Sequence, residues 1–208
     1  MDLPSITEHF LDRTHHNQKS YNNFLNRLQS IYASMDKKYQ ELADHYGFHC
    51  TGCEDNCCFT RFYHYTFLEY LYVIEGYNNL NQKKKVAVQR KALGVCQKTD
   101  RADETGLPVK LMCPLNYRGL CLIYEYRPMI CRLHGISHEL HMPDRNIVYG
   151  SGCESFTQQS QGKKPCNIDR TPFYAEMAEL EKDLRETVGV TQKIKMTLAQ
   201  MIKSFPDQ

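Results

Sequence analysis

Ten cysteines constrain this chain more than any other feature, and eight of them fall into two clusters. The first cluster is C-x2-C-x3-C-C, formed by Cys50, Cys53, Cys57 and Cys58. Two cysteines separated by two residues can face one ion across a tight turn, which explains why this spacing recurs in zinc and iron–sulfur sites. Neighbouring side chains diverge, so Cys57 and Cys58 rarely both complete one tetrahedral site. Either they serve two metal centres that lie close together, or one is a ligand and the other lies beside the site.

The second cluster has longer and less regular spacings. Its members are Cys113, Cys121, Cys131 and Cys153. Four upstream and four downstream cysteines make the number that two four-cysteine centres need. Cys96 and Cys166 are additional. The alternative to metal ligation is a set of reduced structural thiols or disulfides.

Two arginines, Arg127 and Arg132, flank Cys131. A four-thiolate zinc site carries a net charge of about −2, and so does an oxidised [4Fe–4S] cluster with four cysteines, by simple charge counting. The guanidinium groups can neutralise this charge by donating hydrogen bonds towards sulfur or the nearby backbone. Surface salt bridges are the alternative role for both arginines.

The pattern resembles the YkgJ-type cysteine-cluster family, which is described as a zinc- or iron-chelating domain and is named for its C-x2-C-x2-C-C motif. The resemblance covers about half of the chain and rests on the first cluster, on C-P-L at Cys113, and on C-L-I-Y-E-Y-R-P-M-I-C-R from Cys121 to Arg132. This chain departs from the motif because three residues, instead of two, separate Cys53 from Cys57. The resemblance implies metal chelation. Flagellin lysine-N-methylases look related through a similar cluster, which adds an enzymatic alternative.

All-thiolate ligation suits both zinc and iron–sulfur clusters. The long spacings and the vicinal pair slightly favour an iron–sulfur cluster, [4Fe–4S], with zinc as the alternative. Histidines compete as ligands, because His49 adjoins Cys50 and His64 follows the first cluster. His134 is the strongest reserve ligand, since Cys131-x2-His134 would also chelate a metal.

Composition places these cysteines in a reducing compartment. The N-terminal residues M-D-L-P-S-I-T-E lack the basic segment and the apolar stretch of a signal peptide. No run approaches the roughly 20 apolar residues of a transmembrane helix, so we expect a cytoplasmic protein with no membrane partner. Clustered thiols there are metal ligands or redox groups more often than disulfides. The formal net charge of +2 gives no reason to expect nucleic acid as a partner.

Hydrophobic periodicity predicts a mainly α fold, with helices packed around an irregular, cysteine-rich metal-binding centre and few short strands. The predicted helices cover 5–46, 66–76, 78–92, 171–188 and 191–205, with capping boxes at Ser5–Glu8 and Thr66–Glu69 and a helix stop at Gly76. An apolar seam from Tyr21 to Tyr46 predicts packing against the rest of the domain, or alternatively a dimeric coiled coil. The run 120–126 resembles a strand.

This pattern divides the chain into an N-terminal helical segment (1–47), a cysteine-cluster metal-binding domain (48–168) and C-terminal helices (169–208), which we expect to pack as one unit. We favour a metal-binding protein in which the metal centre organises the fold and supports interaction with a protein partner or a redox function. A metal-dependent modifying enzyme is the alternative, although the sequence holds no P-loop and no H-E-x-x-H motif. A zinc-dependent nucleic-acid binder is disfavoured by the balanced charge.

Overall fold

The structure is a computed structural model that describes residues 18–50 and 56–205. In this part the chain is mainly helical with few short strands, as the sequence predicts. Its helices are α2 (Gln18–Tyr46), α3 (Phe67–Asn78), α4 (Gln82–Thr105), α5 (Met129–Leu133), α6 (Glu154–Gln159), α7 (Thr171–Val188) and α8 (Leu198–Lys203), with a 3₁₀ turn, η1, at Tyr124–Tyr126. Its strands are β1 (Asn116–Tyr117), β2 (Leu120–Cys121), β3 (His138–His141), β4 (Ile147–Gly150) and β5 (Ile168–Asp169).

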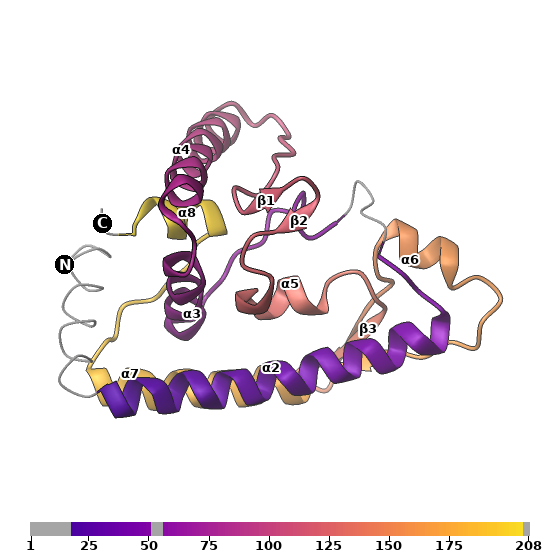
Figure 1. Cartoon of the computed structure of the whole chain (residues 1–208). Coiled ribbons are helices and arrows are strands. Elements are labelled where there is room, and N and C mark those ends of the chain that lie inside the picture. The colour runs from indigo at the N-terminus through magenta and orange to yellow at the C-terminus, as the bar shows by residue number, and fades with distance from the viewer. Residues whose placement is uncertain (1–17, 51–55, 206–208) are drawn as a thin grey trace.

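The long helix α2 forms one side of the molecule and runs beside α7 in the opposite direction (Figure 1). An ion pair between Arg27 and Asp183, at 2.8 Å, joins the two helices near the start of α2. The predicted apolar seam is buried, with Leu28 and Met35 fully covered. The seam therefore packs within the chain, against α7, α5 and α3. The predicted capping box at residues 5–8 lies outside the described residues.

Helix α3 begins at the predicted cap, where the Thr66 hydroxyl accepts a hydrogen bond from the backbone N–H of Glu69 at 3.2 Å. The predicted stop at Gly76 is wrong, because the helix continues to Asn78. Gly76 instead permits a close approach: a Cβ atom there would lie 2.5 Å from the Cβ atom of Tyr126. The glycine serves tertiary packing and not helix termination.

The third and last helices also differ from their predicted bounds. Helix α4 passes through Gly94 and ends at Gly106, whose φ of 67° is the left-handed conformation typical of a helix end. The last helix starts after Thr197, with a complete capping box to Gln200, and not at the predicted cap Thr191. The preceding chain stays extended because the backbone of Met196 pairs with that of His64.

The strands form one hairpin and one small sheet. Strands β1 and β2 pair antiparallel, and the second sheet has the order β4-β3-β5. Of the strand-like run 120–126, only Leu120–Cys121 forms a strand; residues 122–123 form a turn and Tyr124–Tyr126 forms η1. Helix α7 has the predicted bounds, with proline in its first turn and a left-handed Gly189 at its end.

One hydrophobic cluster joins all three predicted segments of the chain. It contains Tyr32 from the first segment, Leu133 from the second and Leu180 from the third, and all three are almost fully buried. Helices α4 and α8 pack together on the opposite side of the molecule from α2 (Figure 1). Among the described helices, none is both long and apolar enough to span a bilayer.

Candidate metal centre

Five cysteines from separate parts of the chain converge at the centre of the molecule. They are Cys57, Cys58, Cys113, Cys121 and Cys131. The thiols of Cys57 and Cys58 interact with each other, and Cys58 interacts with Cys113 and Cys121. Cys131 interacts with Cys113 and Cys121, and also with Cys57. The fold therefore brings together five of the seven described members of the two predicted clusters.

An Asn56 turn positions the vicinal pair. The Asn56 side-chain oxygen accepts hydrogen bonds from the backbone N–H groups of Cys58, at 2.9 Å, and Phe59, at 3.2 Å. This arrangement mimics a backbone turn and fixes the chain locally. The backbone N–H of Cys113 then donates to the carbonyl of Cys58 at 2.7 Å, so the two distant segments touch through their backbones.

The β1–β2 hairpin returns Cys121 to the side of Cys113. Its two turn residues, Arg118 and Gly119, have φ angles of 52° and 85°. Positive φ at both central positions defines a tight turn whose twist matches that of paired strands. The hairpin pairs Asn116 with Cys121, which brings the second of these cysteines back beside the first.

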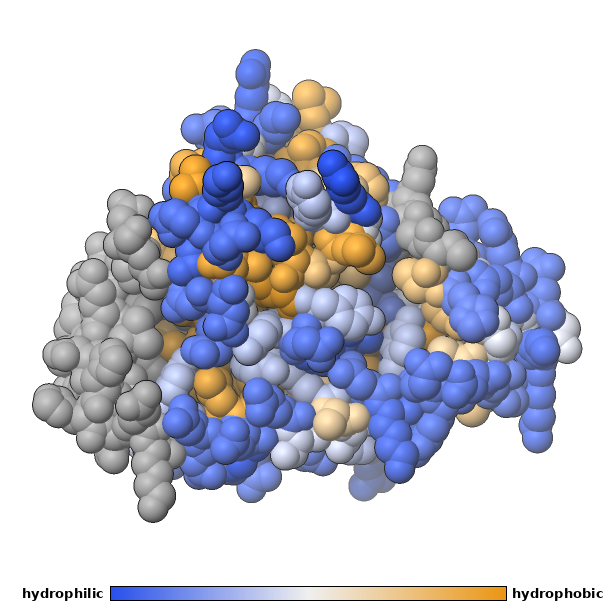
Figure 2. Space-filling view, viewed as in Figure 1, coloured by the Kyte–Doolittle hydropathy of each residue, from blue (hydrophilic) through white to orange (hydrophobic). Residues whose placement is uncertain are grey.

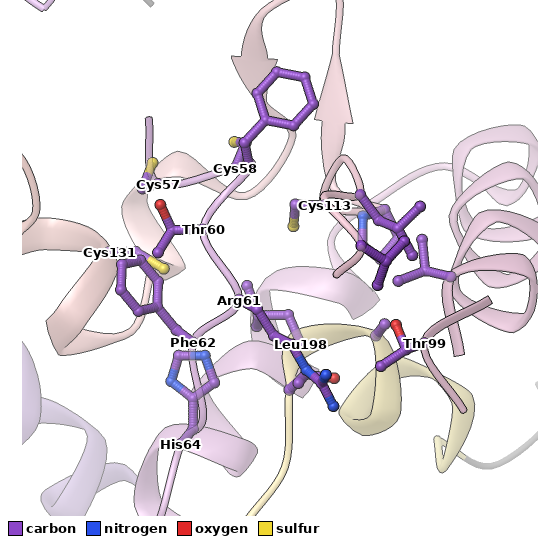
Figure 3. A pocket seen from close by; sticks show the side chains of 17 residues that line it. Cys57, Cys58, Thr60, Arg61, Phe62, His64, Thr99, Cys113, Cys131 and Leu198 are labelled. Carbon is purple, nitrogen blue, oxygen red and sulfur yellow. The ribbon is translucent and has the colours of Figure 1, made fainter. Parts of the chain in front are cut away.

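Helix α5 carries Cys131, and a buried carboxylate holds its first turn. The backbone N–H of Met129 donates to Glu69 Oε1 at 2.9 Å, and the Thr66 hydroxyl donates to Glu69 Oε2 at 2.8 Å. These bonds join the start of α5 to the start of α3. They leave Cys131 buried, with its sulfur directed toward the site (Figure 3).

Cys50 and Cys153 lie in a second group, around the hydroxyl of Tyr39. Burial raises the pKa of Tyr39, and the nearby thiols of Cys50 and Cys153 raise it further. Cys153 is the N-cap of α6 and accepts a hydrogen bond from the backbone N–H of Phe156 at 3.4 Å. Cys53, the remaining predicted ligand, lies outside the described residues.

The side chain of Gln159 holds the first cysteine segment against α6. Its amide oxygen accepts from the backbone N–H of His49 at 3.0 Å, and its amide nitrogen donates to the His49 carbonyl at 3.1 Å. These bonds satisfy both backbone groups of the residue before Cys50, and they hold that residue against the last residue of α6.

Arg127 is the cation that faces both groups. It lowers the pKa values of Cys57, Cys58, Cys121 and Cys131, and also that of Tyr39. Its guanidinium Nε donates to the Tyr124 carbonyl at 2.9 Å and lies over the Tyr124 ring. The predicted role of Arg127, beside the sulfurs, is consistent with this position.

Arg132 is almost fully buried and binds mainly to protein oxygens. It donates to Asp36 Oδ2 at 2.5 Å, to the Arg127 carbonyl at 2.9 Å, and to the carbonyl of Glu125. Its guanidinium also lies 4.3 Å from the ring centroid of Tyr32. Arg132 therefore acts on the sulfurs through its charge, which lowers the pKa of the nearby thiol of Cys121.

Burial keeps most of the converging sulfurs protonated in the metal-free chain. Burial raises the pKa of Cys113 to about 12, and it raises the pKa values of Cys121 and Cys131 as well. The vicinal pair differs, because a hydrogen bond from the Cys57 thiol lowers the pKa of Cys58 to about 6. The same pairing raises the pKa of Cys57.

A cavity of about 60 Å³ adjoins the sulfurs. Its walls include four cysteines and one histidine: Cys57, Cys58, Cys113, Cys131 and His64. The facing wall comes from α4 and α8, where Thr99 and Leu198 line the cavity (Figure 3). Figure 2 shows apolar side chains gathered between α8 and the β1–β2 hairpin, on the face above this region.

The other cysteines and the reserve histidine lie elsewhere. Cys96 is buried in α4, where its thiol interacts with Lys203 and Asp100. Cys166 is exposed, and its backbone binds the hydroxyl of Tyr46. The ring of His134 packs edge-on against Phe62, with the ring centroids 5.3 Å apart. The nine cysteines within the described ranges are all free thiols, so none of them forms a disulfide with another.

A further group of ligand-type side chains, which the sequence did not suggest, lies on the surface. The side-chain ligand atoms of Glu139, His141 and Asp169 all lie within 4.8 Å of one another. Residues 139 and 141 alternate along β3, and Glu139 pairs with Asp169 across the sheet. Strand alternation is the signal that could have found this group, but the predicted elements include no strand there. Among the described residues, no three cysteine sulfurs meet the same 4.8 Å criterion.

Comparisons with known proteins add no relative. No family model, curated protein or solved structure matches this chain.

Proposed function

We propose that this chain is a metal-binding cysteine-cluster protein in which thiolates from two distant segments hold a metal centre that organises the fold. One observation carries the proposal: Cys57 and Cys58 converge with the three downstream cysteines 113, 121 and 131. Buried thiols that are scattered in a core need no partner, but five in one place are typical of a ligand set. The described members of this set are free thiols, which is the state that metal binding requires.

The spacing of the sulfurs supports an iron–sulfur cluster, [4Fe–4S], in preference to zinc. With Zn–S bonds of about 2.3 Å, a tetrahedral zinc site brings its sulfurs to about 3.8 Å from one another. No three sulfurs of the described cysteines are mutually within 4.8 Å. In an iron–sulfur cluster the cysteines bind different iron atoms, so their sulfurs stand farther apart. A zinc site would require the thiols to move inward.

The charges around the sulfurs also suit an anionic centre. When bound, the cluster would bring redox or electron-sink chemistry, while the chain supplies the ligands and their surroundings. Arg127 faces four of the five converging thiols and would offset the negative charge of the thiolates. Burial of Cys113 and Cys131 excludes water and so strengthens this interaction.

The second group supports two centres in place of one. Cys50 and Cys153 share the neighbourhood of Tyr39. Because adjacent side chains diverge along a chain, each member of the vicinal pair can serve a different group. Under this scheme one member of the pair joins Cys113 and Cys131, and the other joins Cys50 and Cys153.

The resemblance to the YkgJ-type cysteine-cluster family agrees with this function. A second candidate function is a metal-dependent modifying enzyme, related to the flagellin lysine-N-methylases. The observation in its favour is the cavity, because Cys113 and Cys131 line a space that also reaches α4 and α8. A purely structural metal site needs no such space. A protein partner and a cytoplasmic location remain part of the proposal.

The proposal is tested by purifying the protein without oxygen and measuring iron, acid-labile sulfide and zinc per chain, together with the visible absorption of iron–thiolate bonds. We expect stoichiometric iron and sulfide in the natural chain and their loss in Cys131→Ser. The matched control is Cys96→Ser, which replaces an equally buried cysteine in α4. Glu139→Ala in every protein removes one side chain of the surface group, so that any cation held there does not add to the count.

Equal metal content in Cys131→Ser and Cys96→Ser, or a natural chain that binds neither metal in stoichiometric amounts, would refute the proposal. Stoichiometric zinc without sulfide would keep metal binding and reject the cluster. Chelation of the metal should also unfold the chain, because ligand binding energy is folding energy in such proteins.

A further inference from the structure

His64 is buried in the wall of the cavity, and its ring nitrogen lacks a partner. The residue is 2% exposed, and its Nε2 atom has no hydrogen-bond partner among the described residues. A buried nitrogen without a partner costs free energy, so such an atom in a native fold points to a group that is missing from the coordinates. The ring extends toward the cavity on the side of Cys131 (Figure 3).

The position of His64 is fixed by its backbone. Its N–H donates to the carbonyl of Met196 at 2.8 Å, and the N–H of Met196 donates to the His64 carbonyl at 3.0 Å. This pair of bonds anchors the segment that follows the vicinal cysteines to the chain that precedes α8. The backbone that carries the ring is therefore anchored beside the cavity.

The cysteines that line the cavity supply three ligands for one metal centre, which leaves one position for a nitrogen ligand. Four of the five converging cysteines line it, and two of these four are the vicinal pair, of which one member suits a given site. Three of the thiolates that line the cavity can therefore bind the same metal centre. Cys121 is not among the described residues that line it. A four-coordinate site needs one more donor, and His64 is a cavity-lining residue whose Nε2 atom is unpaired.

We propose that His64 binds the metal centre directly through Nε2, as the nitrogen ligand beside Cys113, Cys131 and one member of the vicinal pair. This inference rests on the proposed function and deepens it. Neutral imidazole is a common metal ligand, and three cysteines with one histidine form a known zinc donor set. In iron–sulfur proteins, imidazole in place of thiolate raises the reduction potential.

The proposed histidine ligand differs from the one that the sequence favoured. Sequence spacing favoured His134, which follows Cys131 by three residues. In the fold the His134 ring packs against Phe62 and is not among the described residues that line the cavity. His134 is therefore the matched control for His64, as a histidine close to the same cysteines in space and in sequence.

The test is X-ray absorption at the edge of whichever metal the protein carries when it is purified without oxygen. Imidazole ligands give multiple scattering from the ring that sulfur ligands lack. We expect this signal in the natural chain and in His134→Ala, and we expect its loss in His64→Ala. A second variant, His64→Cys, keeps four donors and should retain the metal with a sulfur-only spectrum, even if His64→Ala binds metal weakly or folds poorly.

A natural chain that holds stoichiometric metal through sulfur alone would overturn the inference and leave the proposed function intact. An imidazole signal that persists in His64→Cys would also overturn it, as would loss of the signal in His134→Ala alone. Absence of stoichiometric metal from the natural chain would refute the proposed function and this inference together.

Discussion

A carboxylate on α7 caps the start of α3, and its removal should destabilise the whole chain. Glu181 Oε1 accepts from the backbone N–H of Phe67 at 2.8 Å, and Oε2 accepts from that of Leu68 at 2.9 Å. Both donors lie in the first turn of α3, where the helix itself offers no acceptor. Glu181 is buried and also accepts a hydrogen bond from Arg185. One side chain thus joins two helices that are distant in the sequence.

The substitution Glu181→Gln keeps the shape of the side chain and removes one acceptor. The amide oxygen can still accept from Phe67, but the amide nitrogen then faces the N–H of Leu68, donor against donor. A buried donor left without an acceptor costs about 1–3 kcal/mol. Loss of a negative charge at a helix N-terminus adds about 0.3–1 kcal/mol, and up to about 2 kcal/mol when partly buried. We therefore expect unfolding to be easier by roughly 2–4 kcal/mol.

The assay is urea unfolding followed by circular dichroism, at equal metal content in every variant. With a urea m value of about 2 kcal/mol/M, the midpoint should fall by roughly 1–2 M. Glu186→Gln is the matched control: this residue lies on the same helix, is 67% exposed on its side chain, and stands 3.8 Å from Lys182. Its loss should change stability by less than about 0.5 kcal/mol. Equal midpoints for the two variants would refute the capping argument.

Three further predictions concern the surroundings of the site. Gly76→Ala should destabilise the chain by about 1–3 kcal/mol, because the new Cβ would lie 2.5 Å from Tyr126 Cβ. Gly94→Ala, with open space around this position of α4, should instead stabilise the chain by about 0.4–1 kcal/mol. Urea midpoints that move in the same direction in the two variants would contradict this pair of predictions. Gln159→Ala should speed alkylation of the Cys50 thiol in metal-free protein, since it removes both hydrogen bonds to the backbone of His49. Gln158→Ala, which removes a hydrogen bond to Glu154, should not change this rate, and equal rates for the two variants would rule out the role of Gln159. Arg132→Lys should lower the free energy of unfolding by about 2–4 kcal/mol, because a lysine ammonium cannot reach the three oxygen partners of Arg132 together. Arg27→Lys, at an exposed ion pair, should lower it by less than about 1 kcal/mol. Similar losses for the two variants in thermal or urea unfolding would argue against the buried network.

Local sequence signals predict which segments are helical more accurately than they predict where the helices end. The apolar seam of α2, the Thr66 cap and the bounds of α7 follow from residues close together in the chain, so the sequence predicts them. The ends of α3 and α4 do not follow in this way, because a glycine reads as a helix stop unless a neighbour such as Tyr126 requires it for packing. The small β sheet escaped prediction for a similar reason: its pairing of Glu139 with Asp169 joins residues 30 apart.

The sequence by itself determined the chemistry of this protein: ten cysteines in recognisable spacings, a balanced charge, and helical periodicity on both sides of the cysteine-rich stretch. Tertiary structure alone decided which of these groups meet. It separated Cys96 and Cys166 from the converging thiols, placed Arg127 among them, and brought His64 in place of His134 to the cavity. The physical reason is that spacing along a chain limits which neighbours can share an ion, whereas contacts between distant segments depend on how buried helices and backbone hydrogen bonds pack them together.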